Sequence, residues 1–238
     1  DYARANGRKK VTCFTKDNIM KLTDGLFHKV FDEIGADYPE IEKEHWIVDI
    51  GAAKLADSPG QFDVIVMPNL YGDILSDVAA QITGSVGLGA SANIGAHCAM
   101  FEAIHGSAPR MAGQGTANPS GLLLAGVMMM VHVGQSDVAA RVHNAWLRTI
   151  EDGIHTKDIY RPERSVEKVG TMAFAEAIIA RLGQLPRQFP PISYAAGGER
   201  IAVYEPQRRP PAQRELVGID VFVQSTKDPE ALARDLKA

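Results

Sequence analysis

Apolar and polar positions in the first third of the chain follow strand and helix periods in turn, which predicts alternating elements. The β-branched run at 9–15 predicts a strand. The apolar spacing at 16–35 predicts a helix, with Asp17 as its N-cap and Gly35 as its C-terminal stop. Further patterns predict a strand at 45–50, a short helix at 52–57, a fully buried strand at 62–67 and a helix at 71–83. This order indicates an α/β fold.

The next hundred residues are predicted to be mainly helical after two loops. The expected elements are a glycine-rich loop at 84–96, a strand at 99–104, a polar loop at 105–119 and helices at 118–134, 136–154 and 171–183. Asn118 is the expected N-cap of the first of these helices. Pro119 then takes the first helical position, where a missing N–H costs nothing.

Prolines and glycines concentrated after residue 184 predict a linker. We therefore divide the chain into residues 1–184, a linker at 185–198 and a tail at 199–238. Within the tail, patterns predict strands at 199–206 and 215–225 and a helix at 228–238. About 40 residues are too few to bury a convincing core alone.

Composition and charge exclude several classes of protein. Apolar residues make up 45% of the chain, the net charge is −4 and the pI is about 6.0, so nucleic acid is not expected as a partner. The most apolar stretch, 121–134, is too short for a membrane span and predicts a core helix. Two distant cysteines, Cys13 and Cys98, and the lack of a signal-peptide pattern favour a reducing compartment, the cytoplasm.

Asp73 and Asp77 share one face of the predicted helix at 71–83, directly after a buried strand. A solvated acidic face is the simple explanation, with Asp73 favoured near the helix N-terminus. Junctions of this kind are where α/β proteins place sites, and carboxylate oxygens suit Mg²⁺ or Mn²⁺. Asp49 is expected at the end of the preceding strand, either as an ordinary turn aspartate or as a third acid of a metal site.

The polar loop at 105–119 is the second candidate region. Its small residues would let the backbone approach a ligand closely, and Arg110 could hold a phosphate. An ordinary surface loop with a solvated arginine explains the same residues. Neither a GxGxxG fingerprint nor a P-loop is present in the sequence.

Two long stretches, "NLYGDILSDVAAQITGSVGLGASANIG" and "MFEAIHGSAPRMAGQGTANPSGLLLAGVMM", resemble the isocitrate and isopropylmalate dehydrogenase family of β-decarboxylating dehydrogenases. The resemblance runs over about residues 1–184, and "TKDNIMKLTDGLF" and "VDIGAAKL" fit it as well. It leans toward the isocitrate enzymes. The tail is similar to part of the small α/β C-terminal domain of the longer bacterial members, so a partial family fold plus part of this domain is expected.

The resemblance implies roles for individual residues. Asp73 and Asp77 would bind Mg²⁺ or Mn²⁺, with Asp49 contributed by the neighbouring subunit of a homodimer. Lys16 would be the catalytic lysine, acting on the partner's substrate; without the resemblance it would be taken for a surface lysine at a helix start. The residues implied to contact the cofactor are Asn18, His105, Gly106, Ser107, Ala108, Arg110, Met111 and Asn118.

The implied reaction is the oxidative decarboxylation of isocitrate to 2-oxoglutarate with reduction of NADP. A cation in the site would lower the pKa of the substrate hydroxyl and stabilise the enolate left after CO₂ loss. NAD-using relatives tend to carry an acid at position 110, whereas an arginine can bind the 2′-phosphate of NADP. Many NADP enzymes of the family show Lys-Tyr at 110 and 111, so the Arg-Met found here lacks one expected contact.

The family resemblance also sets expectations for assembly and completeness. The helices at 71–83 and 118–133 are candidates for the dimer interface or the core. The family's N-terminal half, which carries a serine, arginines and a tyrosine of the active site, is not recognised here, so the 238 residues are expected to be inactive alone. Isopropylmalate, homoisocitrate or tartrate dehydrogenases, and a non-catalytic regulatory or assembly homologue, are the alternatives.

Overall fold

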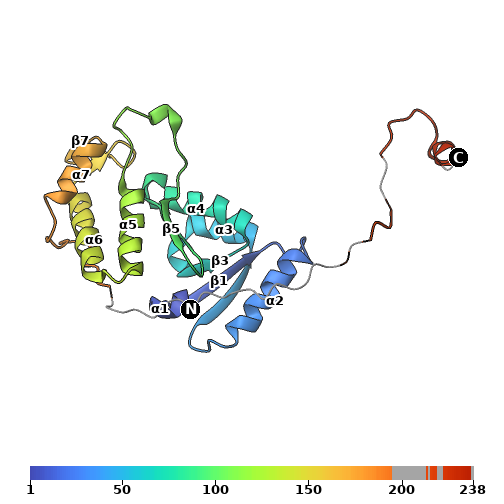
Figure 1. Cartoon of the computed structure of the whole chain (residues 1–238), viewed down its shortest axis with the longest axis horizontal. Coiled ribbons are helices and arrows are strands. Elements are labelled where there is room, and N and C mark those ends of the chain that lie inside the picture. Colours follow the sequence, from blue (N-terminus) through green and yellow to red (C-terminus); the bar gives the residue numbers. More distant parts are fainter. Residues whose placement is uncertain (195–212, 214, 219–221, 237–238) are drawn as a thin grey trace. The chain divides into compact units, whose positions relative to one another are not determined.

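The structure is a computed structural model that describes residues 1–194, 213, 215–218 and 222–236. It divides into two units, Asp1–Tyr204 and Glu205–Ala238. The first contains the strands and all but one of the helices found in the described residues (Figure 1).

The helices are α1 Tyr2–Ala5, α2 Thr23–Gly35, α3 Val48–Asp57, α4 Asn69–Thr83, α5 Ser120–His132, α6 Ser136–Glu151, α7 Thr171–Ile179 and α8 Pro229–Asp235, with short 3₁₀ turns η1 Pro59–Gln61, η2 Val86–Leu88 and η3 Pro109–Met111. The strands are β1 Lys10–Thr15, β2 Glu42–Ile47, β3 Val64–Val66, β4 Ala90–Ile94, β5 Ala99–Ala103, β6 Ile154–Thr156 and β7 Glu167–Val169.

A three-stranded parallel sheet with the order β2-β1-β3 forms the centre of the first half. The central strand β1 is the most buried, because α2 and the α3–α4 pair cover the sheet from opposite sides (Figure 1). Phe14 of β1 is fully buried and forms a core cluster with Leu55 of α3 and Leu75 of α4. Gly51 lets α3 approach this ring, since a Cβ there would lie 2.7 Å from Phe14.

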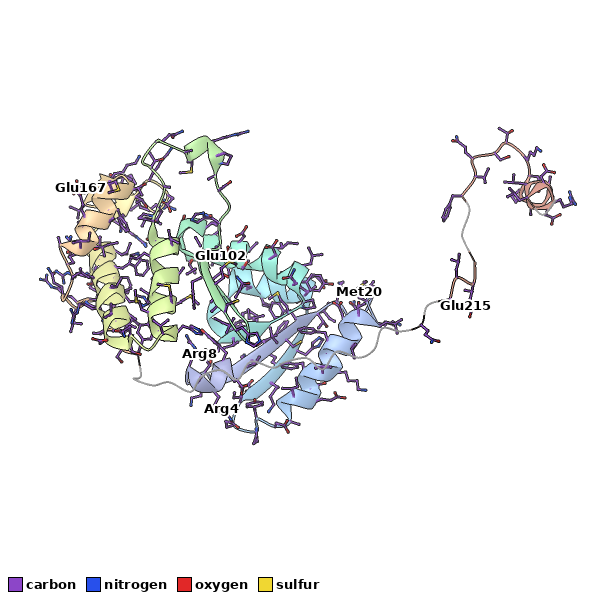
Figure 2. All side chains as sticks on the ribbon, viewed as in Figure 1. Arg4, Arg8, Met20, Glu102, Glu167 and Glu215 are labelled. Carbon is purple, nitrogen blue, oxygen red and sulfur yellow. The ribbon has the colours of Figure 1, made fainter. Side chains whose placement is uncertain are left out.

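The second half of this unit packs helices against an antiparallel hairpin. β4 and β5 pair with each other, and α5 packs on both strands and on α6. On the hairpin, Asn93 donates across the two strands to Glu102 at 3.0 Å, and Figure 2 labels Glu102. A second core cluster joins Ala145 of α6 to Phe174 and Ile178 of α7. No described helix is long and apolar enough to cross a membrane.

Several predicted boundaries are wrong. The predicted helix at 16–35 begins only at Thr23, and Asp17 does not cap it, because its carboxylate binds the His28 ring instead. β2 ends at Ile47, so Asp49 lies in the first turn of α3, where the helix dipole favours an acid, and not at a strand end.

Other differences concern the loops and caps. The glycine-rich segment contains β4, which was predicted as loop, and β3 is half-buried where full burial was predicted. α5 begins at Ser120, one residue after Pro119. Asn118 nevertheless accepts the Ser120 N–H at 3.0 Å, which is the bond that an N-cap makes.

The segment after residue 184 is tied to α6 as far as the described residues extend. The Glu151 carboxylate accepts the backbone N–H groups of residues 187, 188 and 189. Asn144 exchanges two hydrogen bonds with the backbone of Ile192, each of 2.8 Å. The predicted linker at 185–198 is therefore hydrogen-bonded to α6 at residues 187–189 and 192, within the first unit.

The described part of the tail confirms its helix. α8 corresponds to the predicted helix at 228–238, and Asp228 caps it by accepting two backbone N–H groups. The predicted strand at 199–206 lies outside the described residues. In the predicted strand at 215–225, the described residues 215–218 and 222–225 form no regular element.

Candidate active site

The carboxyl ends of the three parallel strands bring several predicted site residues to one edge of the sheet. Lys16 follows β1, Asp49 lies two residues after β2, and β3 leads into α4 with Asp73 and Asp77. Parallel strands present their carboxyl ends at the same edge, and α/β proteins bind ligands there. This edge of the sheet is therefore the candidate ligand site of the first unit.

Lys16 and Asp49 form an ion pair at this edge. The Lys16 ammonium lies 2.7 Å from Asp49 Oδ1, and this hydrogen bond lowers the pKa of the Asp49 carboxyl. The Lys16 backbone N–H donates to the buried Asp24 carboxylate at 2.7 Å. Two independent bonds therefore hold the lysine where β1 ends.

Asp73 and Asp77 are exposed, while Leu75 between them is buried in the core. The helix thus presents both carboxylates on a face turned away from the sheet. Oxygen ligands from exposed carboxylates suit a hard dication that keeps several waters, so the residues present fit Mg²⁺ or Mn²⁺. Among the described residues, neither of these acids joins Asp49 in a group of metal-ligating side chains.

Asn18 lies in the turn between β1 and α2. The Lys16 carbonyl accepts the backbone N–H groups of Ile19 and Met20, which closes this turn. Figure 2 labels Met20 beside the start of α2. Asn18 is exposed and lies two residues after the lysine, in the same turn.

The predicted cofactor loop contains one strained backbone position. Ala108 has φ +41° and ψ 59°, a left-handed conformation that alanine rarely adopts. The residues before it, His105, Gly106 and Ser107, are all exposed. Strained residues of this kind cluster at ligand sites, so the strain at Ala108 supports a ligand contact at this turn.

Arg110 and Met111 belong to the 3₁₀ turn η3 and are both exposed. The Arg110 carbonyl accepts a bond from Gln114 at 2.6 Å, which fixes the backbone of the turn. Its guanidinium has no partner within the described part of the chain. Its five donors are therefore available for an anion.

Asn118 is 7% exposed, and both ends of its amide are engaged. The nitrogen donates to Asp158 at 3.0 Å and the oxygen accepts the Ser120 N–H. Burial raises the pKa of Asp158, but hydrogen bonds that include the one from Asn118 outweigh it and hold the pKa below its ordinary value. The side chain thus joins the start of α5 to the segment after β6, and its contact with adenine stays a prediction.

Comparisons with known proteins establish the family of the chain. The family model described as isocitrate/isopropylmalate dehydrogenase matches residues 1–178. This chain belongs to the isocitrate/isopropylmalate dehydrogenase family. It has the mixed α/β fold of that family, as its solved neighbours also indicate.

Two curated relatives and one solved structure illustrate how similar the chain is to members of the family. The isocitrate dehydrogenase [NADP] of Rickettsia typhi is 58% identical over 224 residues, which cover 94% of this chain and 46% of the relative. The Thermus thermophilus isocitrate dehydrogenase [NADP] is 41% identical over 248 residues, covering 100% of this chain and 47% of the relative. The crystal structure of the Methylococcus capsulatus isocitrate dehydrogenase matches with a TM-score of 0.73 and 48% identity, over 77% of this chain and 53% of that one. The chain thus spans about half the length of the curated relatives that it matches.

One cluster at the same edge was not predicted. Asp17, His28 and His45 bring a carboxylate and two imidazoles together from three elements. The two rings stack with their centroids 3.5 Å apart. The sequence carries no local signal for this cluster, because the strand register that aligns His45 with Cys13 has to be known first.

Proposed function

We propose that the protein oxidatively decarboxylates isocitrate to 2-oxoglutarate and reduces NADP. The observation that carries this proposal is the Lys16–Asp49 pair at the carboxyl edge of the sheet, beside the helix that carries Asp73 and Asp77. Relatives named isocitrate dehydrogenase [NADP] support the choice of substrate and cofactor.

Each residue of the site has a proposed role. Asp73 and Asp77 would hold Mg²⁺ or Mn²⁺ in their own subunit, and Asp49 would reach the site of the partner. The bound cation would make the substrate hydroxyl more acidic and stabilise the enolate that follows loss of CO₂. Lys16 would take the hydroxyl proton directly or through water. Asp49 orients this lysine through the bond of 2.7 Å.

The proposed cofactor contacts come from Asn18 and the loop after β5. Asn18 would approach the nicotinamide end, while His105, Gly106, Ser107 and Ala108 would line the adenosine side. The free guanidinium of Arg110 supports NADP, since it offers paired donors to a 2′-phosphate. Met111 would lie beside this phosphate without a polar contact. Asn118 would contact the adenine through its backbone, because its side chain is occupied.

We further propose a homodimer with shared sites. A row of exposed apolar side chains along α4 supports an interface there, because such rows seldom stay in water. The row comprises Leu70, Ile74, Val78 and Ile82, which are 66%, 55%, 38% and 38% exposed. Leu122 of α5 is also 66% exposed. Residues 1–184 would form the dehydrogenase part and 199–238 an accessory part in a cytoplasmic enzyme.

The test is the turnover of the intact protein, purified and supplied with Mg²⁺ and NADP. We expect NADPH formation with isocitrate, and a kcat/KM at least tenfold lower with isopropylmalate, homoisocitrate or tartrate. Faster turnover of one of those three acids than of isocitrate would identify that acid as the substrate instead. Absence of turnover with all four, together with retained binding of NADP, would instead support a regulatory homologue.

A further inference from the structure

Three side chains from separate elements meet behind Lys16. Asp17 follows β1, His28 lies in the second turn of α2 and His45 lies in β2. Their ligating atoms are all within 4.8 Å of one another. Their side chains are 21–26% exposed, so an ion from solution can reach them.

The spacing of these atoms is close to that around a tetrahedral metal ion. Asp17 Oδ2 lies 2.7 Å from His28 Nδ1 and 3.8 Å from His45 Nε2. Tetrahedral zinc, with ligands at about 2.1 Å, places neighbouring ligand atoms about 3.4 Å apart. The two observed distances bracket that value, and they would have to change by about 0.7 and 0.4 Å to reach it.

The surroundings of the cluster also favour a cation. His28 Nε2 lies 3.7 Å from Asp32 Oδ2, and a carboxylate behind an imidazole is the usual second partner of a metal-bound histidine. Burial, followed by the charges of three carboxylates, raises the pKa of the Cys13 thiol to about 12. Of these three carboxylates, Asp17 belongs to the cluster and Asp32 lies beside His28.

We propose that Asp17, His28 and His45 form a binding site for a transition-metal dication such as Zn²⁺. Two imidazoles and one carboxylate suit zinc, whereas the oxygen-only acids of α4 suit Mg²⁺. The proposal goes beyond the dehydrogenase activity and does not depend on it. A bound ion would fix the turn that carries Lys16.

Binding requires one change in the cluster. The imidazole planes are 14° from parallel, and a metal ion has to lie near the plane of each ring. One ring must therefore turn, and His45 then gives up its bond of 2.8 Å with Thr15 Oγ1. Metal binding should accordingly separate the stacked rings.

The test is isothermal titration of the untagged protein with Zn²⁺ in excess Mg²⁺. We expect one zinc per chain, and at least tenfold weaker binding in Asp17→Asn, His28→Ala and His45→Ala. Asp17→Asn changes no side-chain volume, so it keeps the test valid if a histidine variant fails to fold. His97→Ala, which removes an exposed histidine elsewhere, and Asp73→Asn are the matched controls and should leave the affinity unchanged.

Co²⁺ provides a readout on the unaltered chain. Its visible absorption should show a four-coordinate ion, and X-ray absorption should show two imidazole nitrogens. Zinc affinity that survives His28→Ala combined with His45→Ala would overturn the proposal. Absence of saturable zinc binding, or a loss caused by Asp73→Asn alone, would overturn it equally.

Discussion

Lys16 and Asp49 are joined by an ion pair of 2.7 Å, although they follow two different strands and are 33 residues apart. Both residues are proposed to serve the site of the partner subunit. A lysine and an aspartate that move together as one unit would enter that site in a fixed relative position. The first prediction tests whether this pairing matters for turnover.

Asp49→Asn in the intact protein should lower kcat by about a hundredfold, because the lysine loses its orienting carboxylate and the site loses a metal ligand. Steady-state rates with isocitrate measure the effect. Asp57→Asn removes an exposed acid at the other end of α3 and should leave kcat within twofold. If Asp49→Asn and Asp57→Asn have equal kcat values, Asp49 does not take part in turnover.

Arg110→Asp should lower the ratio of kcat/KM for NADP over NAD by about ten- to a hundredfold. This factor corresponds to the free energy of one charged hydrogen bond to a phosphate. The new carboxylate repels the 2′-phosphate and can bind ribose hydroxyls. Arg141→Asp, at an exposed position on α6, is the charge-matched control. An unchanged ratio in Arg110→Asp would mean that this arginine does not select the cofactor.

Asp152 links α6 to the segment just after α7 through Arg148 and Arg181, at 3.1 and 2.8 Å. The hydrogen bond from Arg181, with the charges of both arginines, lowers the pKa of Asp152. A lowered folded-state pKa stabilises the fold above the unfolded value of about 3.9, and this stabilisation is lost as the pH falls through the folded pKa.

Asp152→Asn should therefore lower the free energy of unfolding by about 1–2 kcal/mol at pH 7, because Arg148 stays buried without its counter-charge. The difference from the unaltered protein should shrink below about pH 4. Urea unfolding at the two pH values measures it. Asp137→Asn, at the exposed start of α6, should cost only a few tenths of a kcal/mol. A cost that does not change with pH would show that the charge of Asp152 is not the cause.

Ile82→Glu should shift the intact protein from dimer to monomer, since it places a charge in the apolar row of α4. Light scattering gives the mass. Leu216→Glu is the control, because Leu216 is 83% exposed and belongs to the other unit. Identical dimer masses for both variants would place the interface elsewhere.

The sequence predicted the elements of the first unit more reliably than the geometry of its site. Runs such as 9–15 and 136–154 were found because burial imposes a clear period on them. Asp17 and Asp49 were misplaced because both lie at junctions, where tertiary bonds decide the boundary: Asp17 binds His28, and Asp49 pairs with Lys16. No local pattern encodes such contacts between distant segments.

A mixed dimer gives the sharpest test of a dehydrogenase whose sites are shared between two subunits. One subunit would carry Lys16→Met and the other Asp73→Asn, each with its own affinity tag, and the heterodimer would be purified. Both parent homodimers should be nearly inactive. The heterodimer restores one complete site, so it should show about half of the turnover of the unaltered dimer. A heterodimer as inactive as its parents would contradict the shared site.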